Sequence, residues 1–257
     1  MDQLHNLKPI PFWMSLLFFG IPSAIGTTGL YVVLPILIEA GFPMLLIFIL
    51  TVSGMFPLLL LAALIAYRLE GHSLSVIDIA NRFRIKRLGK REWRWTIGLL
   101  VVYVGGQLLL MPTARWLIAG LPLPLPAMLP PAIDPRVANS IPTEFLGVVL
   151  RGNWGIAFLY LLILSFNIFG EEFWWRGYIL PRQELVHGKW TWLVHGILWT
   201  LFHIPFWWNL ISLLPSTLSL SFVASRLKNT TPGIIAHFVL NGLGFVMILL
   251  GILGIGS

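Results

Sequence analysis

The chain contains no cysteine and little charge. Of its 257 residues, 57% are hydrophobic and only 11% are Asp, Glu, Lys or Arg, whereas a soluble globular domain carries about 25% charged residues. The absence of cysteine excludes disulfide bonds, a thiol nucleophile and a cysteine-ligated metal. The only aspartates are Asp2, Asp78 and Asp134, and none lies in a long apolar run. A catalytic pair of intramembrane aspartates is therefore excluded, and the sequence has no Gly-x-Ser-Gly nucleophile motif.

Long apolar runs make up most of the sequence. They are too long for the strands of a membrane β-barrel and do not alternate as such strands do. A transmembrane helix needs about 20 apolar residues, so we predict an all-α, polytopic membrane helix bundle. It is a single integral membrane domain over residues 1–257 with about seven spans, of which the sixth is short enough to be re-entrant. The predicted spans are roughly 12–39, 44–68, 95–119, 153–180, 190–208, 210–224 and 231–253.

The basic residues indicate how the chain is oriented. The 17 Lys and Arg outnumber the 10 Asp and Glu and give a net charge of +7. They lie mainly between the apolar runs, so we attribute them to topology and anionic membrane lipid, and we predict no nucleic-acid partner. With a cytoplasmic N-terminus, only Arg115, Arg136 and Arg151 fall on the outer side. The positive-inside rule thus predicts a multi-pass protein of the cell membrane with its N-terminus in the cytoplasm.

Residues 68–94 form the most basic segment of the chain. Ser75 and Asp78 have the spacing of a helix capping box, and apolar residues follow at helical spacing. We predict a basic interfacial helix that lies on the cytoplasmic surface of the membrane.

Residues 121–142 are too rich in proline to form a regular span. We predict an ordered or semi-rigid loop on the outer side of the bundle. Its prolines are Pro122, Pro124, Pro126, Pro130, Pro131, Pro135 and Pro142.

Two adjacent carboxylates, Glu171 and Glu172, interrupt an apolar run that is otherwise almost free of charge. An ionisable residue inside a membrane is costly and indicates a functional site. On a helix, Glu172 and Arg176 are four residues apart, so they share a face and can pair. Glu171 points about 100° away from its neighbour, so its partner must come from another helix.

The C-terminal apolar runs offer four polar candidates for that partner: His195, His203, His237 and Asn241. His237 and Asn241 are four residues apart, and His195 and His203 are eight apart, so each pair lies on roughly one side of its helix. Each residue alone is more typical of a hydrogen bond between helices than of catalysis. Polar groups that three helices direct to one interior point, however, have the geometry of a site in the bundle core.

Three short motifs occur in order on these runs. Residues 171–176 read Glu-Glu-Phe-Trp-Trp-Arg, residues 199–203 read Trp-Thr-Leu-Phe-His, and residues 237–241 read His-Phe-Val-Leu-Asn. This pattern resembles the signature of the CAAX prenyl protease and bacteriocin-processing family (CPBP or Abi family) of glutamic-type intramembrane proteases. The resemblance covers about residues 153–250. Trp199 stands where the family most often has phenylalanine, and we interpret it as a change of bulk on the same helix face.

The resemblance implies a CAAX-type intramembrane protease with a water-activating site. Carried over to this sequence, Glu171 is the general base, and His203 helps to hold or polarise the water. His237 and Asn241 face the scissile carbonyl, where their N–H groups suit a developing oxyanion. The catalytic candidates are thus Glu171, His203, His237 and Asn241, and the supporting residues are Glu172 and Arg176.

A bound zinc ion is the alternative mechanism. Glu171, His203 and His237 offer one carboxylate and two imidazoles, a ligand set that suits zinc. The His-Glu-x-x-His arrangement of common zinc proteases is absent from the sequence. We therefore favour water activation without a metal or another cofactor.

The implied partners are membrane lipid and a peptide or protein substrate, such as a prenylated C-terminus or a peptide precursor. The sequence gives no indication of the oligomeric state. The alternative function is that of a non-catalytic bacteriocin-immunity or peptide-binding membrane protein. The complete set of motifs favours catalysis, because a binding protein has no need of Glu171. A small carrier is disfavoured by the absence of internal repeats.

Overall fold

The structure is a computed structural model that describes residues 7–129, 134–136 and 141–255. Helices dominate these residues, and the strands among them form one antiparallel hairpin. The first half contains α1 (Phe12–Thr28), η1 (Gly29–Val33), α2 (Leu34–Glu39), α3 (Met44–Phe48), η2 (Ile49–Ser53), α4 (Met55–Leu69), α5 (Val76–Arg82), α6 (Lys90–Leu100), η3 (Val101–Gly105), α7 (Gly106–Leu110) and α8 (Thr113–Gly120). The second half contains β1 (Glu144–Phe145), β2 (Val148–Val149), α9 (Trp154–Glu171), η4 (Glu172–Ile179), α10 (Leu180–His187), η5 (Gly188–Trp190), α11 (Thr191–Phe202), η6 (Ile204–Asn209), α12 (Leu210–Leu227) and α13 (Thr231–Ile252).

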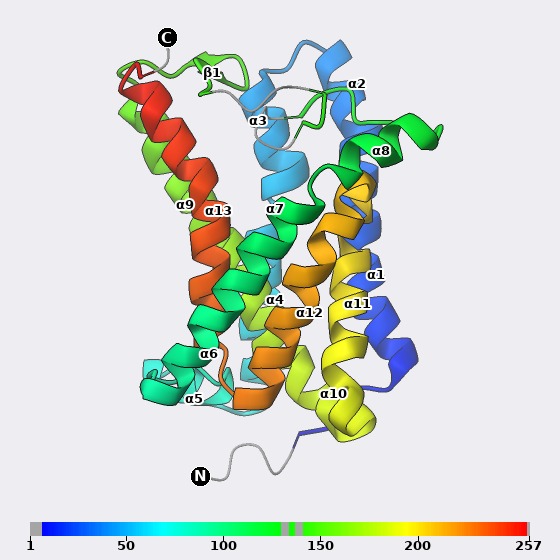
Figure 1. Cartoon of the computed structure of the whole chain (residues 1–257), viewed down its shortest axis with the longest axis vertical. Coiled ribbons are helices and arrows are strands. Elements are labelled where there is room, and N and C mark those ends of the chain that lie inside the picture. The colour runs from blue at the N-terminus through cyan, green and yellow to red at the C-terminus, as the bar shows by residue number, and fades with distance from the viewer. Residues whose placement is uncertain (1–6, 130–133, 137–140, 256–257) are drawn as a thin grey trace.

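The long helices run along the longest axis of the molecule (Figure 1). α5 and α10 lie at one end, which we call the α5 end, and α2, α8 and the β-hairpin lie at the other, the hairpin end. Apolar helices long enough to cross a membrane make up most of the described chain. The predicted all-α, polytopic bundle is therefore confirmed, and the chain is a multi-pass membrane protein.

Among the described residues, six helical segments are long and apolar enough to cross a membrane, against about seven predicted. The difference arises at Trp154–Phe202, a single helical segment of 49 residues that covers our fourth span and most of our fifth. A straight helix of that length would extend about 74 Å, well beyond a hydrocarbon core of about 30 Å. The segment instead turns at the α5 end, where Gly188 has φ +52°, and α9 and α11 lie at separate positions (Figure 1).

Gly170 brings α9 into backbone contact with α4. A Cβ atom at this position would collide with the carbonyl oxygen of Phe56, so a larger residue would force the two helices apart. Gly170 directly precedes Glu171, and the contact therefore fixes where Glu171 lies relative to α4. The helix then continues as η4, a π-helical segment of eight residues. Such segments are rare and are frequent at functional sites.

The first part of the proline-rich segment is ordered, as predicted. Trp207 Nε1 donates a hydrogen bond to the carbonyl oxygen of Pro124 at 3.0 Å. Leu125 and the buried Leu129 pack in the apolar cluster around Trp208. These residues therefore cover the end of the bundle near η6, whereas Pro130 and Pro131, like Asp2, lie outside the described residues.

Ser75 caps α5, as the sequence predicts. Its Oγ accepts a hydrogen bond from the N–H of Asp78 at 3.1 Å. Val76 and Ile77 are 81% and 73% exposed, which suits a short helix at a membrane surface. The basic segment thus contains a helix of the expected kind, but it has only seven residues.

Three residues at and after the end of α5 lie inside the protein. Arg82 and Phe83 are completely buried, and Arg84 is nearly so. Phe83 packs against Gly177, where a Cβ atom would lie 2.9 Å from the Phe83 side chain. Arg84 Nη1 pairs with Glu184 Oε2 at 2.9 Å. The prediction that residues 68–94 lie on the membrane surface is therefore wrong for Arg82, Phe83 and Arg84, because these side chains are buried in the bundle.

Glu70 is the centre of an ion cluster at the α5 end. Arg82 Nε donates to Glu70 Oε2 at 2.7 Å, and Arg182 donates to Glu70 Oε1. The cluster joins the end of α4 to α5 and α10. Burial alone would raise the pKa of the Glu70 carboxyl, but the hydrogen bonds and charges of the two arginines hold that pKa below its usual value of 4.5.

We predict that Glu70 contributes to the acid sensitivity of the fold. Because its folded-state pKa is lowered, the cluster stabilises the protein above the usual carboxyl pKa and loses this contribution as the pH falls through the lowered value. Glu70→Gln should lower the unfolding temperature near neutral pH and flatten its decline in acid. The measurement is thermal unfolding in detergent across this pH range, with the exposed Glu39→Gln as the control. An acid profile identical to that of the wild type would contradict the prediction.

Candidate active site

The two glutamates lie at the junction of α9 and η4. Glu171 is the last residue of α9 and Glu172 the first residue of η4. Their exposed fractions are 2% and 0%, so each carboxylate depends on protein partners in place of water. The two side chains find different partners.

Glu172 belongs to a buried ion cluster. Arg176 Nη1 lies 3.3 Å from Glu172 Oε1, as the four-residue spacing predicts, and His237 Nδ1 lies 3.2 Å from the same oxygen. Gly233 allows α13 to come this close, because a Cβ atom there would lie 2.7 Å from Glu172 Oε2. Glu172 is therefore paired with a cation inside the bundle and connects η4 to α13.

Glu171 accepts hydrogen bonds from neutral donors. Asn167 Nδ2, one turn earlier on α9, donates to Oε1 at 2.8 Å, and Trp199 Nε1 on α11 donates to Oε2 at 2.8 Å. Asn241 Nδ2 on α13 donates in turn to Asn167 Oδ1 at 2.7 Å. A chain of hydrogen bonds thus joins α13, α9 and α11 through Glu171.

The Trp199 ring lies among residues from all three motifs. The guanidinium carbon of Arg176 is 3.3 Å from the ring centroid. The imidazoles of His203 and His237 approach in a T-shaped arrangement, with centroids at 5.6 and 6.0 Å. Among the described residues, the three guanidinium nitrogens of Arg176 find no hydrogen-bond acceptor, so stacking on Trp199 and the charge of Glu172 are what stabilise this cation.

His203 directly follows α11. Its Nδ1 lies 2.8 Å from the carbonyl oxygen of Trp199. A carbonyl oxygen only accepts hydrogen bonds, so Nδ1 carries the proton and Nε2 is the acceptor nitrogen of the neutral ring. The backbone of α11 therefore fixes both the orientation and the tautomer of His203.

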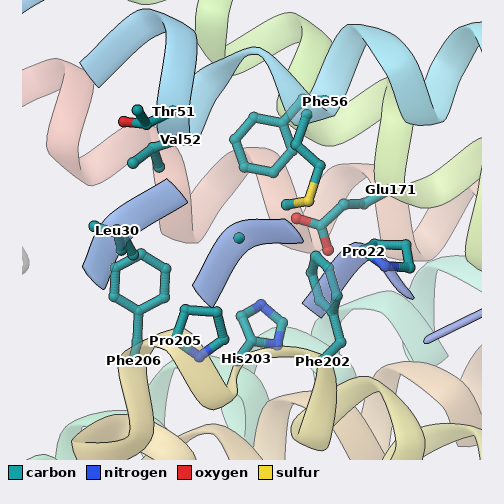
Figure 2. Close-up of a pocket in the computed structure, with 12 residues that line it drawn as sticks. Pro22, Leu30, Thr51, Val52, Phe56, Glu171, Phe202, His203, Pro205 and Phe206 are labelled. Carbon is teal, nitrogen blue, oxygen red and sulfur yellow. The ribbon is translucent and has the colours of Figure 1, made fainter. Parts of the chain in front are cut away.

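A cavity of about 50 Å³ borders both Glu171 and His203 (Figure 2). A volume of this size, measured for water-sized spheres, has room for more than one water molecule. The rest of its wall comes mainly from α1, η2, α4 and η6 and is apolar apart from one threonine. These wall residues are Pro22, Gly26, Leu30, Thr51, Val52, Met55, Phe56, Phe202, Pro205 and Phe206.

The four predicted catalytic residues fall into two groups. Glu171 and His203 line the cavity. His237 and Asn241 do not line it and instead bind other members of the site. All four nevertheless lie within one network around Trp199 and the two glutamates.

His195, the remaining polar candidate, does not join this network through any hydrogen bond between the described residues. Its Nδ1 lies 2.6 Å from Gln183 Oε1, and Gln183 Nε2 donates to Ser15 Oγ at 3.0 Å. His195 therefore links α11 to α10 and α1, which is the structural role that an isolated membrane histidine usually has.

Two partners of Glu171 escape the sequence analysis. Asn167 is a polar residue in an apolar run, four residues before Glu171, and this spacing would have indicated a contact. Trp199, which we interpret from the sequence as a change of bulk, proves to be a hydrogen-bond donor to Glu171. The motif pattern gives no signal for this donor, because phenylalanine at the same position has none.

The predicted zinc ligands do not form a ligand set in this conformation. Within the described part of the chain, no group of three or more His, Cys, Asp or Glu side chains is arranged to hold a metal ion. Both oxygens of Glu171 accept protein hydrogen bonds, and His237 Nδ1 is directed to Glu172. The donor geometry therefore does not fit a metal bound by Glu171, His203 and His237 together.

We predict that Glu172→Gln destabilises the protein by about 3 kcal/mol, because it leaves the buried Arg176 charge without its counter-ion. The measurement is the unfolding midpoint in detergent. The double variant Glu172→Leu with Arg176→Met is the matched control, and it should recover much of the loss because neither charge is then buried. Equal stability of the wild type and Glu172→Gln would contradict the prediction.

Residues 153–243 match the family described as type II CAAX prenyl endopeptidase Rce1-like. The matched segment begins where the predicted core begins and contains all three motifs. Comparisons with curated proteins and with solved structures gave no significant match. The family match supports the resemblance drawn from the motifs: residues 153–243 of this multi-pass membrane protein are similar to the type II CAAX prenyl endopeptidases that this family describes.

Proposed function

We propose that the protein is an intramembrane endopeptidase in which Glu171 activates a water molecule against a peptide bond. The cavity beside Glu171 and His203 supports this proposal most strongly, because it has room for water next to a carboxylate and an imidazole. Glu172 is a poor candidate for the same role, since Arg176 and His237 already engage it.

In the proposed step, Glu171 takes a proton from water while the water oxygen attacks the substrate carbonyl carbon. His203 Nε2 accepts a hydrogen bond from the other O–H group and so orients the attacking lone pair. The peptide C–N bond then breaks, and the proton passes from Glu171 to the leaving amine. Water is the only co-reactant, and the products are a carboxylate and an amine.

We assign His237 and Asn241 to the developing oxyanion. His237 uses Nδ1 toward Glu172, and Asn241 uses one N–H toward Asn167. The second amide proton of Asn241 therefore stays available for a substrate oxygen, and His237 Nε2 donates to that oxygen when both ring nitrogens carry a proton. Neither residue lines the cavity, so a bound peptide has to extend the cavity toward α13.

The proposed substrate is a membrane-associated peptide, such as a prenylated C-terminus or a lipid-bound peptide precursor. The walls that α1, η2 and α4 contribute are almost entirely apolar, which suits a segment that enters from the membrane. The alternative proposal, a non-catalytic immunity or peptide-binding protein, uses the same cavity without Glu171 chemistry.

We predict that Glu171→Gln, His203→Ala and His237→Ala each lower peptide cleavage at least about 100-fold, because each removes a group that acts on the reacting atoms. The measurement is cleavage of a peptide library in detergent, analysed by mass spectrometry, with size-exclusion profiles to show folding. His187→Ala, outside the cavity, controls for the loss of an imidazole and should cleave normally. Wild-type rates in all three variants would disprove the site.

A chelator separates the two mechanisms in the same assay. Cleavage that persists with chelator but is lost in Glu171→Gln supports metal-free water activation. Cleavage that is lost with chelator and restored by zinc would support the metal mechanism. If neither the wild type nor Glu171→Gln cuts a library that includes prenylated and precursor peptides, the result would support the binding function.

We also propose that the α5 end faces the cytoplasm, because the exposed basic residues of the loops gather there. The absence of cysteine allows single cysteines to report this directly. In intact cells, an impermeant maleimide should label Glu144→Cys, at the hairpin end, but not Lys86→Cys until the membrane is opened. Both native residues are exposed. The reverse labelling pattern would contradict the proposed orientation.

A further inference from the structure

Trp199 makes two polar contacts at once. Its indole N–H donates to Glu171 Oε2 at 2.8 Å, and the Arg176 guanidinium lies over its face, 3.3 Å from the ring centroid. The side chain is buried, with 2% of the residue exposed. We propose that Trp199 is a positioning residue for the proposed base: its N–H fixes the Glu171 carboxylate in the orientation that receives water. This inference rests on the proposed function.

The hydrogen bond matters because Glu171 forms part of a cavity wall. Asn167 occupies one carboxylate oxygen and Trp199 the other, so the two donors together define the plane of the carboxylate. An ionised carboxylate can accept about four hydrogen bonds, and each oxygen therefore keeps capacity to bind water. Without the Trp199 donor the carboxylate can rotate, and a catalytic group misplaced by about 1 Å can lose about 100-fold in rate.

Arg176 makes Trp199 a stronger donor. A cation over the face of an indole draws electron density toward itself, which makes the N–H group more acidic. In a water-poor interior such neighbouring polar contacts strengthen one another. Arg176 thus pairs directly with Glu172 but acts on Glu171 through the indole.

The indole nitrogen is what sets this chain apart from the family pattern. Phenylalanine at this position keeps an aromatic face for Arg176 and edges for His203 and His237, but it cannot donate a hydrogen bond. If Trp199 only fills space, phenylalanine should serve equally well. If the N–H positions the base, phenylalanine should leave the fold intact and slow the reaction.

The first test compares Trp199→Phe with the wild type on a peptide that the wild type cleaves. We expect kcat to fall about 10-fold, the size expected for one hydrogen bond to a charged group, while KM stays within about two-fold. Trp192→Phe is the matched control, because Trp192 lies on the same helix and packs on Phe222 outside the site. An unchanged kcat in Trp199→Phe would overturn the inference.

A second variant keeps the shape of the indole. Benzothienylalanine, incorporated at position 199, replaces the N–H group by sulfur and conserves the two fused rings. It should reproduce the loss of kcat with an unchanged unfolding temperature. Should Trp199→Phe itself unfold, this variant alone decides the question, and wild-type kcat would again overturn the inference.

A spectroscopic readout does not require turnover. In ¹⁵N-labelled protein, the indole N–H signal that disappears in Trp199→Phe belongs to Trp199. In the wild type it should lie downfield, and it should move upfield in Glu171→Ala but not in Trp192→Phe. If the indole N–H signal keeps its position in Glu171→Ala, the hydrogen bond does not form.

The results distinguish this inference from the proposed function. Normal cleavage by Glu171→Gln means that the proposed function is wrong, whatever Trp199 does. Loss of cleavage in Glu171→Gln together with normal kcat in Trp199→Phe leaves the proposed function in place and removes only the positioning role.

Discussion

Two adjacent carboxylates are buried in a membrane bundle, and the rest of the structure accommodates them. An unpaired charge in such surroundings costs several kcal/mol, so Glu171 and Glu172 each need their own partners within the protein. Glu172 takes the cation, Arg176, and the imidazole of His237. Glu171 takes neutral donors from Asn167 and Trp199 and borders the cavity. The difference in partners separates a carboxylate that holds helices together from the one that we propose as the general base.

The helix packing serves this separation. Gly170 allows α9 to touch the backbone of α4, and Gly233 allows α13 to reach the Glu172 carboxylate. Away from the site, Glu70 and its arginines fix α4, α5 and α10 at the α5 end. Elements from both halves of the chain therefore form the site, although the family match begins at residue 153. The apolar wall of the cavity comes largely from α1, η2 and α4, outside that match.

Much of this could be predicted from the sequence. The length of the apolar runs gave the bundle, and the four-residue spacing gave the pairing of Glu172 with Arg176. The gap between the predicted spans 153–180 and 190–208 likewise contains the turn at Gly188. Two features were beyond the reach of periodicity. Buried pairing of the basic segment, as in Arg84 with Glu184, depends on contacts between residues far apart in the chain. The donor role of Trp199 depends on which atom of a side chain faces Glu171, and a pattern of residue types does not contain that information.

In the proposed reaction, water activated by Glu171 is the nucleophile. Single-turnover cleavage in ¹⁸O-labelled water tests it most directly, with enzyme in excess over a cleavable peptide. We predict that the new carboxylate of the product carries ¹⁸O after the first turnover and that the peptide containing Glu171 carries none. An unlabelled product, or ¹⁸O in the Glu171 carboxylate, would contradict this prediction, because either result means that Glu171 attacked the peptide bond itself.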